Sequence, residues 1–224
     1  MDDKLIQQAI NEYYGQIDKD EHARYKSWEH CYSVFLQNKD NNDDDTIDYL
    51  SLHLAFYLAS WGMLRGSSFL LQKDYKIHIG AIKIMKRDEY KNLYGIPIDK
   101  LLEKENFELL IKLIRELKFY YEEIRLSVKQ SKTKISQTLI SKILLGVYGC
   151  VPAFDRYFCD AITKYDICSK SIIKYETYKG LLKFYNEHIE VIEKNRKEIT
   201  KRGVEYSQMK MLDIIFWQIG FDKE

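Results

Sequence analysis

Apolar residues recur at steps of three or four along most of this chain. Such runs cover residues 47–61, 107–124 and 175–192. This spacing places apolar side chains on one face of a helix. The segment 75–86 alternates in part, but the longer spacing of Tyr75, Ile79, Ile82 and Met85 favours a helix there too. We therefore predict an all-α protein, built as a compact multi-helix orthogonal bundle.

Two prolines and one acidic loop interrupt this helical pattern. The loop QNKDNNDDD lies before Thr46 and places acidic residues at the positive end of the helix that follows. Pro97 disfavours helix at the residue before it, and Asp99 is a candidate cap for the next helix. We expect one domain over residues 1–224, or one domain with an acidic N-terminal subdomain over residues 1–45.

Composition indicates a globular protein with a sizeable core. The chain has 224 residues, 46% of them hydrophobic, with 18 tyrosines and 10 phenylalanines. Its longest apolar stretch, Leu54–Leu64, is too short to span a bilayer, and the first residues do not follow the pattern of a signal peptide. We therefore predict a cytoplasmic protein without a membrane partner.

The cysteines and histidines indicate neither a disulfide framework nor a metal site. The four cysteines fit no zinc spacing and are expected to be reduced, buried thiols. The five histidines are scattered, and none forms a pair at positions i and i+4. No metal or other cofactor is therefore expected.

Charge is distributed unevenly between the two parts of the chain. Residues 1–50 carry 12 acidic and 5 basic side chains, whereas the rest of the chain is net positive. Its densest basic run holds Lys129, Lys132 and Lys134 between two predicted helices. Ammonium groups at that place suit the phosphates of a nucleic acid, so DNA is a candidate partner. The alternative is an ordinary solvated loop.

A second candidate anion site lies in the stretch ASWGMLRGSSF. Gly62 and Gly66 are four residues apart, so they share a helix face and allow close packing beside Arg65. Arg65 offers a planar set of donors, and Ser67 and Ser68 suit a new helix start. The alternative is that the two glycines serve packing alone.

The stretch TLISKILLGVYGCVPAFDRYF contains the strongest candidate for chemistry. A predicted helix carrying Lys142 ends at Gly146 or Gly149, and Pro152 prevents its continuation. Asp155 then falls in the cap or first turn of the next helix. A purely structural interpretation has a glycine–proline turn, a capping aspartate and a solvated lysine.

The order of these residues resembles the helix-hairpin-helix DNA glycosylase superfamily, in particular its 8-oxoguanine glycosylase-like branch. Ser141 and Lys142 match the Ser-Lys pair of that family's hairpin, and Pro152 and Asp155 match its step from proline to the catalytic aspartate. The stretch MKMLDIIFWQIG near the C-terminus is similar to a second helix of some members. The chain has no glycine from Lys129 to Lys142, where the family's hairpin usually has a G-x-G turn.

The resemblance implies a nucleic-acid-binding protein that is either an active glycosylase, acting on an extruded damaged base, or a relative that has lost this activity. Lys142 would attack the sugar as a neutral amine, and Asp155 would stabilise the cationic transition state and orient the nucleophile. A lowered pKa of Lys142 is required for this role. The competing hypothesis is a non-enzymatic helical protein that binds other, so far unknown, proteins or regulates them.

Overall fold

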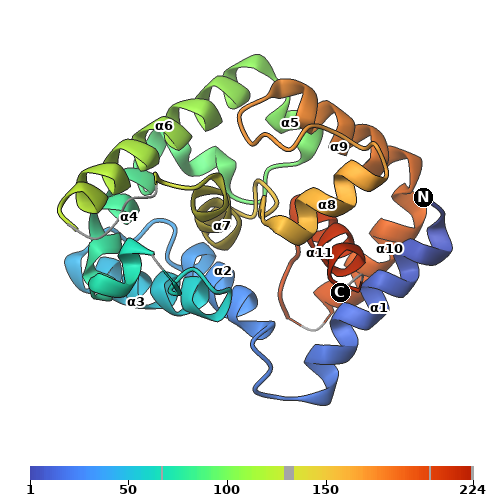
Figure 1. The fold of residues 1–224 in the computed structure, drawn as a ribbon, viewed down its shortest axis with the longest axis horizontal. Coiled ribbons are helices and arrows are strands. Elements are labelled where there is room, and N and C mark those ends of the chain that lie inside the picture. The colour runs from blue at the N-terminus through green and yellow to red at the C-terminus, as the bar shows by residue number, and fades with distance from the viewer. Residues whose placement is uncertain (67, 129–133, 202, 223–224) are drawn as a thin grey trace.

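The computed structural model describes residues 1–66, 68–128, 134–201 and 203–222 and confirms the all-α prediction (Figure 1). No strand occurs in these ranges. The segment 75–86 is helical, as its spacing indicated. The helices are α1 (Asp3–Lys19), α2 (Lys26–Gln37), α3 (Asp44–Ser60), η1 (Phe69–Gln72), η2 (Tyr75–His78), α4 (Ile79–Met85), η3 (Asp88–Leu93), α5 (Ile98–Leu101), α6 (Lys104–Leu126), α7 (Gln137–Tyr148), α8 (Arg156–Lys164), α9 (Tyr175–Glu187), α10 (Ile189–Thr200) and α11 (Gln208–Phe221).

Helix α7 lies at the centre of the molecule, between two groups of helices (Figure 1). One group contains α2, α3, α4 and α6, and α2 and α3 pack directly on α7. The other group contains α1, α8, α9, α10 and α11, and its closest pairs are α8 with α11 and α1 with α11. The chain therefore returns at its end to the helix with which it began. Whether residues 1–45 form a subdomain stays a prediction.

Two helices are buried on all sides. Every residue of α7 from Leu139 to Tyr148 is buried, and so is every residue of α11 from Met209 to Gly220. A helix that is apolar all round belongs in a core, and both sequences are mostly apolar. The polar exceptions are therefore informative, because a buried charged side chain is costly unless it has partners. They are Ser141 and Lys142 in α7 and Lys210, Asp213 and Gln218 in α11.

Local capping explains where several of these helices begin. The Asp43 carboxylate accepts a hydrogen bond from the Thr46 backbone N–H at 2.8 Å, as the acidic loop predicted. At α5 the prediction was wrong in detail. Asp99 lies inside the first turn and caps nothing, and Pro97 occupies the cap position. The Ile98 N–H donates instead to the Gln208 side chain of α11 at 2.8 Å.

The helices and the cysteines also bear on the predictions about membranes and disulfides. Across the described ranges, no helix combines the length and the apolar character needed to cross a bilayer. All four cysteines are free thiols; Cys31 and Cys150 are buried, and Cys159 and Cys168 are half-buried.

Candidate active site

The turn between α7 and α8 has the construction that its glycine and proline predicted. Helix α7 ends at Tyr148 and is capped by Gly149, whose φ of 62° is left-handed and whose N–H donates to the Leu144 carbonyl at 3.1 Å. A side chain at this position would also collide with Ser207, because an added Cβ would lie 2.8 Å from its Oγ. After Pro152 the chain reaches Asp155, which caps α8 by accepting the Phe158 N–H at 3.2 Å.

Three hydrogen bonds fix the residues that precede Asp155. The Phe154 N–H donates to Ser141 Oγ at 2.9 Å, and the Phe154 carbonyl accepts from Thr138 Oγ1 at 2.9 Å. The Ala153 N–H donates to Asp213 Oδ1 of α11 at 2.9 Å. The turn is thus held by α7 on one side and by α11 on the other, which leaves Asp155 little positional freedom.

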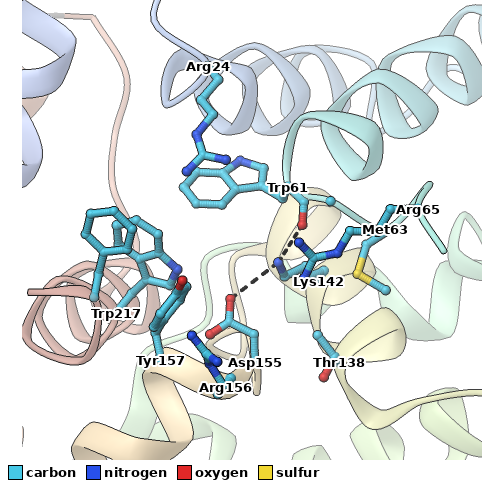
Figure 2. A pocket seen from close by; sticks show the side chains of 12 residues that line it. Arg24, Trp61, Met63, Arg65, Thr138, Lys142, Asp155, Arg156, Tyr157 and Trp217 are labelled. Carbon is cyan, nitrogen blue, oxygen red and sulfur yellow. Dashed lines mark hydrogen bonds and ion pairs between the residues drawn. The ribbon is translucent and has the colours of Figure 1, made fainter. Parts of the chain in front are cut away.

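Lys142 and Asp155 meet at the position that these bonds define. Lys142 Nζ lies 3.3 Å from Asp155 Oδ2, and the two side chains are only 6% and 12% exposed. Nζ also donates to the Trp61 carbonyl at 2.9 Å, at the C-terminal end of α3 (Figure 2). One part of the purely structural interpretation is therefore wrong: Lys142 is not solvated, because the central position of α7 buries it and pairs it with Asp155. Its other parts, the glycine–proline turn and the capping role of Asp155, are confirmed.

Burial dominates the electrostatics of this pair. It lowers the pKa of Lys142, and attraction by Asp155 only partly offsets the effect. Burial likewise raises the pKa of Asp155, against the opposing attraction of Lys142. Arg65 lowers the pKa of Lys142 further. Both shifts favour the neutral forms, so an uncharged amine is more accessible here than at an exposed lysine.

A second buried pair, Lys210 and Asp213, lies in the neighbouring helix α11 and behaves differently. Lys210 Nζ is 2.9 Å from Asp213 Oδ2 and 4.9 Å from the centroid of the Trp28 ring. Burial alone would lower the pKa of Lys210, but Asp213 and Tyr13 outweigh it, and the pKa is raised. Lys210 is therefore held as a cation, whereas Lys142 is driven towards the amine.

Lys142 and Asp155 line a cavity of about 470 Å³, within the range of small-ligand sites (Figure 2). Aromatic rings form part of its wall. The Trp61 and Trp217 rings meet edge to face with centroids 5.4 Å apart, and Trp217 stacks on Phe221 at 4.9 Å. The other lining residues are Arg24, Gly62, Met63, Arg65, Thr138, Arg156 and Tyr157. Such a pocket can accept a planar ring and surround it with positive charge.

The predicted anion site is only partly assembled at this cavity. Arg65 lines it, and its guanidinium lies beside Gly62, where an added Cβ would be 3.4 Å from Arg65 Cζ. Ser67 lies outside the described residues. Ser68 is absent from the described lining of the cavity; its Oγ accepts the Leu70 N–H at 3.3 Å, as the cap of η1.

The predicted basic run lies only partly within the described residues. Lys129 and Lys132 lie outside the described residues. Lys134 is exposed just before α7, and it lines a small surface depression with Glu122 and Phe119 rather than the cavity of Lys142. Its role in binding a nucleic acid stays a prediction.

Several cavity residues were not singled out from the sequence as site residues. Trp217 and Phe221 lie four residues apart on α11, so their common helix face was a usable signal. Trp61 was assigned to an apolar helix face, and Arg24 stands in a polar segment without any distinguishing pattern. Within the described part of the chain, no group of three or more His, Cys, Asp or Glu side chains is placed to hold a metal ion.

No protein-family model matches the chain, and no curated protein or solved structure matches it either. Functional inference therefore depends on the chemistry of the cavity.

Proposed function

We propose that the protein is a DNA glycosylase-like enzyme in which Lys142 is the nucleophile and Asp155 its acid–base partner. The observation that supports this most strongly is the buried 3.3 Å contact between Lys142 Nζ and Asp155 Oδ2, inside an aromatic and basic cavity. A nucleophilic lysine needs a lowered pKa and a neighbouring base, and burial beside Asp155 supplies both. The aromatic rings suit an extruded base.

In the proposed reaction Lys142 first gives a proton to Asp155 and becomes a neutral amine. The amine attacks C1′ of the deoxyribose, the C1′–N bond breaks, and its electrons leave with the base. The departing base takes up a proton from the nitrogen of Lys142. The C1′–O4′ bond then breaks, and O4′ receives the proton held by Asp155. The product is an iminium between Lys142 and C1′, and the Asp155 carboxylate stabilises its positive charge.

Borohydride trapping tests this proposal directly, because it reduces the iminium to a stable amine. We expect the native protein to form a covalent adduct with DNA that carries a damaged base or an abasic site. Lys142→Met should abolish the adduct, and Lys83→Met is a matched control, because Lys83 pairs with Asp44 on the surface. An adduct that persists in Lys142→Met would exclude Lys142 as the nucleophile.

Asp155→Asn separates a chemical role from a structural one. Asparagine caps helices as well as aspartate does, so the fold should be retained. We expect base release to slow much more than binding weakens, because asparagine cannot take up the proton that Lys142 must lose before its amine attacks. Equal base release by both proteins would contradict a chemical role for Asp155.

A second candidate function, protein interaction, is favoured by the outer face of α3. Tyr49, Leu52 and Phe56 follow one another at helical spacing and are 49%, 51% and 63% exposed. A cluster of exposed large apolar side chains is typical of interaction surfaces. Analytical ultracentrifugation tests the simplest case, association between two copies, and Phe56→Glu should abolish it. A purely monomeric native protein would remove that case.

A further inference from the structure

The cavity holds more positive charge than its own carboxylate can balance. Arg24, Arg65 and Arg156 line it together with Lys142, and among its described lining residues Asp155 is the one carboxylate. Asp155 is already paired with Lys142. The excess charge is therefore directed at the space where a ligand would lie.

Two of these arginines differ from Arg87 and Arg196, which lie outside the cavity. In the described part of the chain, neither Arg24 nor Arg65 forms an ion pair, whereas Arg87 lies 2.8 Å from Glu116 and Arg196 lies 2.9 Å from Glu193. The Arg24 guanidinium instead lies 5.4 Å from the Trp61 ring centroid. An arginine held on an aromatic ring keeps its planar donors available for an anion.

The backbone turn at the end of α3 positions Arg65 at the cavity. Helix α3 ends with the Met63 N–H donating to the Leu58 carbonyl at 2.9 Å, and Gly62 adopts a left-handed φ of 73°. The Arg65 guanidinium lies against Gly62, where an added Cβ would be in van der Waals contact with it at 3.4 Å from Cζ. Arg24 reaches the cavity from the segment before α2, and Figure 2 shows the two guanidinium groups apart from each other, near Trp61 and near Lys142 respectively.

We propose that Arg24 and Arg65 each bind a backbone phosphate of a nucleic-acid strand, one on either side of the nucleotide that enters the cavity. This deepens the proposed function and rests on it. A nucleotide within a strand has a phosphate at both its 5′ and 3′ sides, so each of two guanidinium groups on different segments can bind one of them. A free nucleoside monophosphate has a single phosphate and offers the two arginines fewer contacts. Arginine binds phosphate through paired, charge-assisted hydrogen bonds.

Binding measurements without any chemistry test this inference. The main probe is a fluorescein-labelled single-stranded oligonucleotide that contains one tetrahydrofuran abasic analogue, followed by anisotropy at several salt concentrations. Calorimetry with dGMP, deoxyguanosine and inorganic phosphate tests the free ligands. The variants are Arg24→Gln and Arg65→Gln, with Arg87→Gln as the matched control, because Arg87 lies outside the cavity and pairs with Glu116.

We expect each cavity variant to weaken oligonucleotide binding about tenfold and to reduce the slope of log affinity against log salt by about 0.7, the value for one phosphate contact on a single strand. Arg87→Gln should change neither quantity. Unchanged affinity or slope in both cavity variants, or no oligonucleotide binding at all, would overturn the inference. Binding of dGMP as tight as that of the oligonucleotide would also overturn it and identify a free nucleotide as the ligand.

The result is distinguishable from failure of the proposed chemistry. If the arginine variants lose affinity but borohydride traps no adduct, the phosphate sites stand and the role of Lys142 as nucleophile fails. If borohydride traps the native protein and the arginine variants bind normally, the chemistry stands and the phosphate sites fail.

Discussion

Lys142 Nζ lies 3.3 Å from Asp155 Oδ2, although the lysine belongs to the buried centre of α7 and the aspartate to the cap of α8. The glycine–proline turn between the two helices brings the groups together. Because both are largely removed from water, each changes the ionisation of the other, and several measurable properties depend on the pair.

The proposed reaction needs the single proton that Lys142 and Asp155 share, because Asp155 takes it from the amine and later gives it to O4′. The rate of adduct formation should therefore fall at high pH, once the pair loses that proton through the lowered pKa of Lys142. Arg65→Gln should shift this fall to higher pH, because a positive neighbour that lowers the pKa is lost. The measurement is the trapping rate at saturating DNA between about pH 5 and 10, the interval in which a lysine with a lowered pKa titrates. An identical profile in both proteins would contradict this electrostatic link.

Stability should show strong coupling between the two side chains. Lys142→Met leaves a buried carboxylate without its partner and should cost about 3 kcal/mol, the usual scale for breaking a buried pair. Asp155→Asn leaves the Lys142 ammonium without its charged partner but keeps a capping side chain at the start of α8. The double variant should be destabilised by less than the sum of the two single variants, since each already removes the interaction. Urea unfolding of all four proteins measures this difference, and simple additivity would show that the contact contributes nothing.

Ser141 should be more important for stability than an exposed serine in a comparable helix. Ser141→Ala leaves the Phe154 N–H without its acceptor in a buried turn, and we expect a loss of about 1–3 kcal/mol. Ser60→Ala is the control, because the Ser60 hydroxyl donates to the Phe56 carbonyl on the surface. Its effect on the free energy of unfolding should be below about 0.5 kcal/mol. Equal effects of the two substitutions would show that Ser141 does not anchor the turn.

Two glycines should respond in opposite directions to alanine. Gly149→Ala places a side chain at a left-handed φ and 2.8 Å from Ser207 Oγ, so it should destabilise by more than about 1 kcal/mol. Gly15→Ala lies within α1, with open space around the added Cβ, and should stabilise by about 0.5–1 kcal/mol. Thermal unfolding monitored by far-UV circular dichroism compares the variants. A stabilised Gly149→Ala protein would contradict the turn geometry.

Local features of the fold were predictable because their causes lie within a few residues. Gly149 and Pro152 predict the turn through their backbone preferences and Asp155 predicts the cap of α8 through its side chain, while helical spacing identified the long helices. Local sequence did not predict the start of α5, where Asp99 is not the cap. The donor at the start of α5 is satisfied by Gln208, from a helix more than a hundred residues away in sequence. No local pattern contains that information.

The candidate site was predictable only in part for the same reason. Lys142 looks solvated in the sequence, because burial of a lysine depends on partners that tertiary structure supplies, here Asp155 and the Trp61 carbonyl. Nothing in the local sequence marks Arg24 as a site residue, because its contact with the Trp61 ring is formed only in the folded protein. Such residues acquire their chemistry from contacts between distant helices.

The edge-to-face contact between Trp61 and Trp217 has one further consequence. Two indoles held in a fixed, asymmetric arrangement contribute to the near-ultraviolet circular dichroism spectrum, which reports ordered side-chain packing. Two of the chain's three tryptophans lie in this wall. These two tryptophans are therefore an intrinsic spectroscopic label for the cavity. The near-ultraviolet circular dichroism spectrum should change when a planar ring binds beside them.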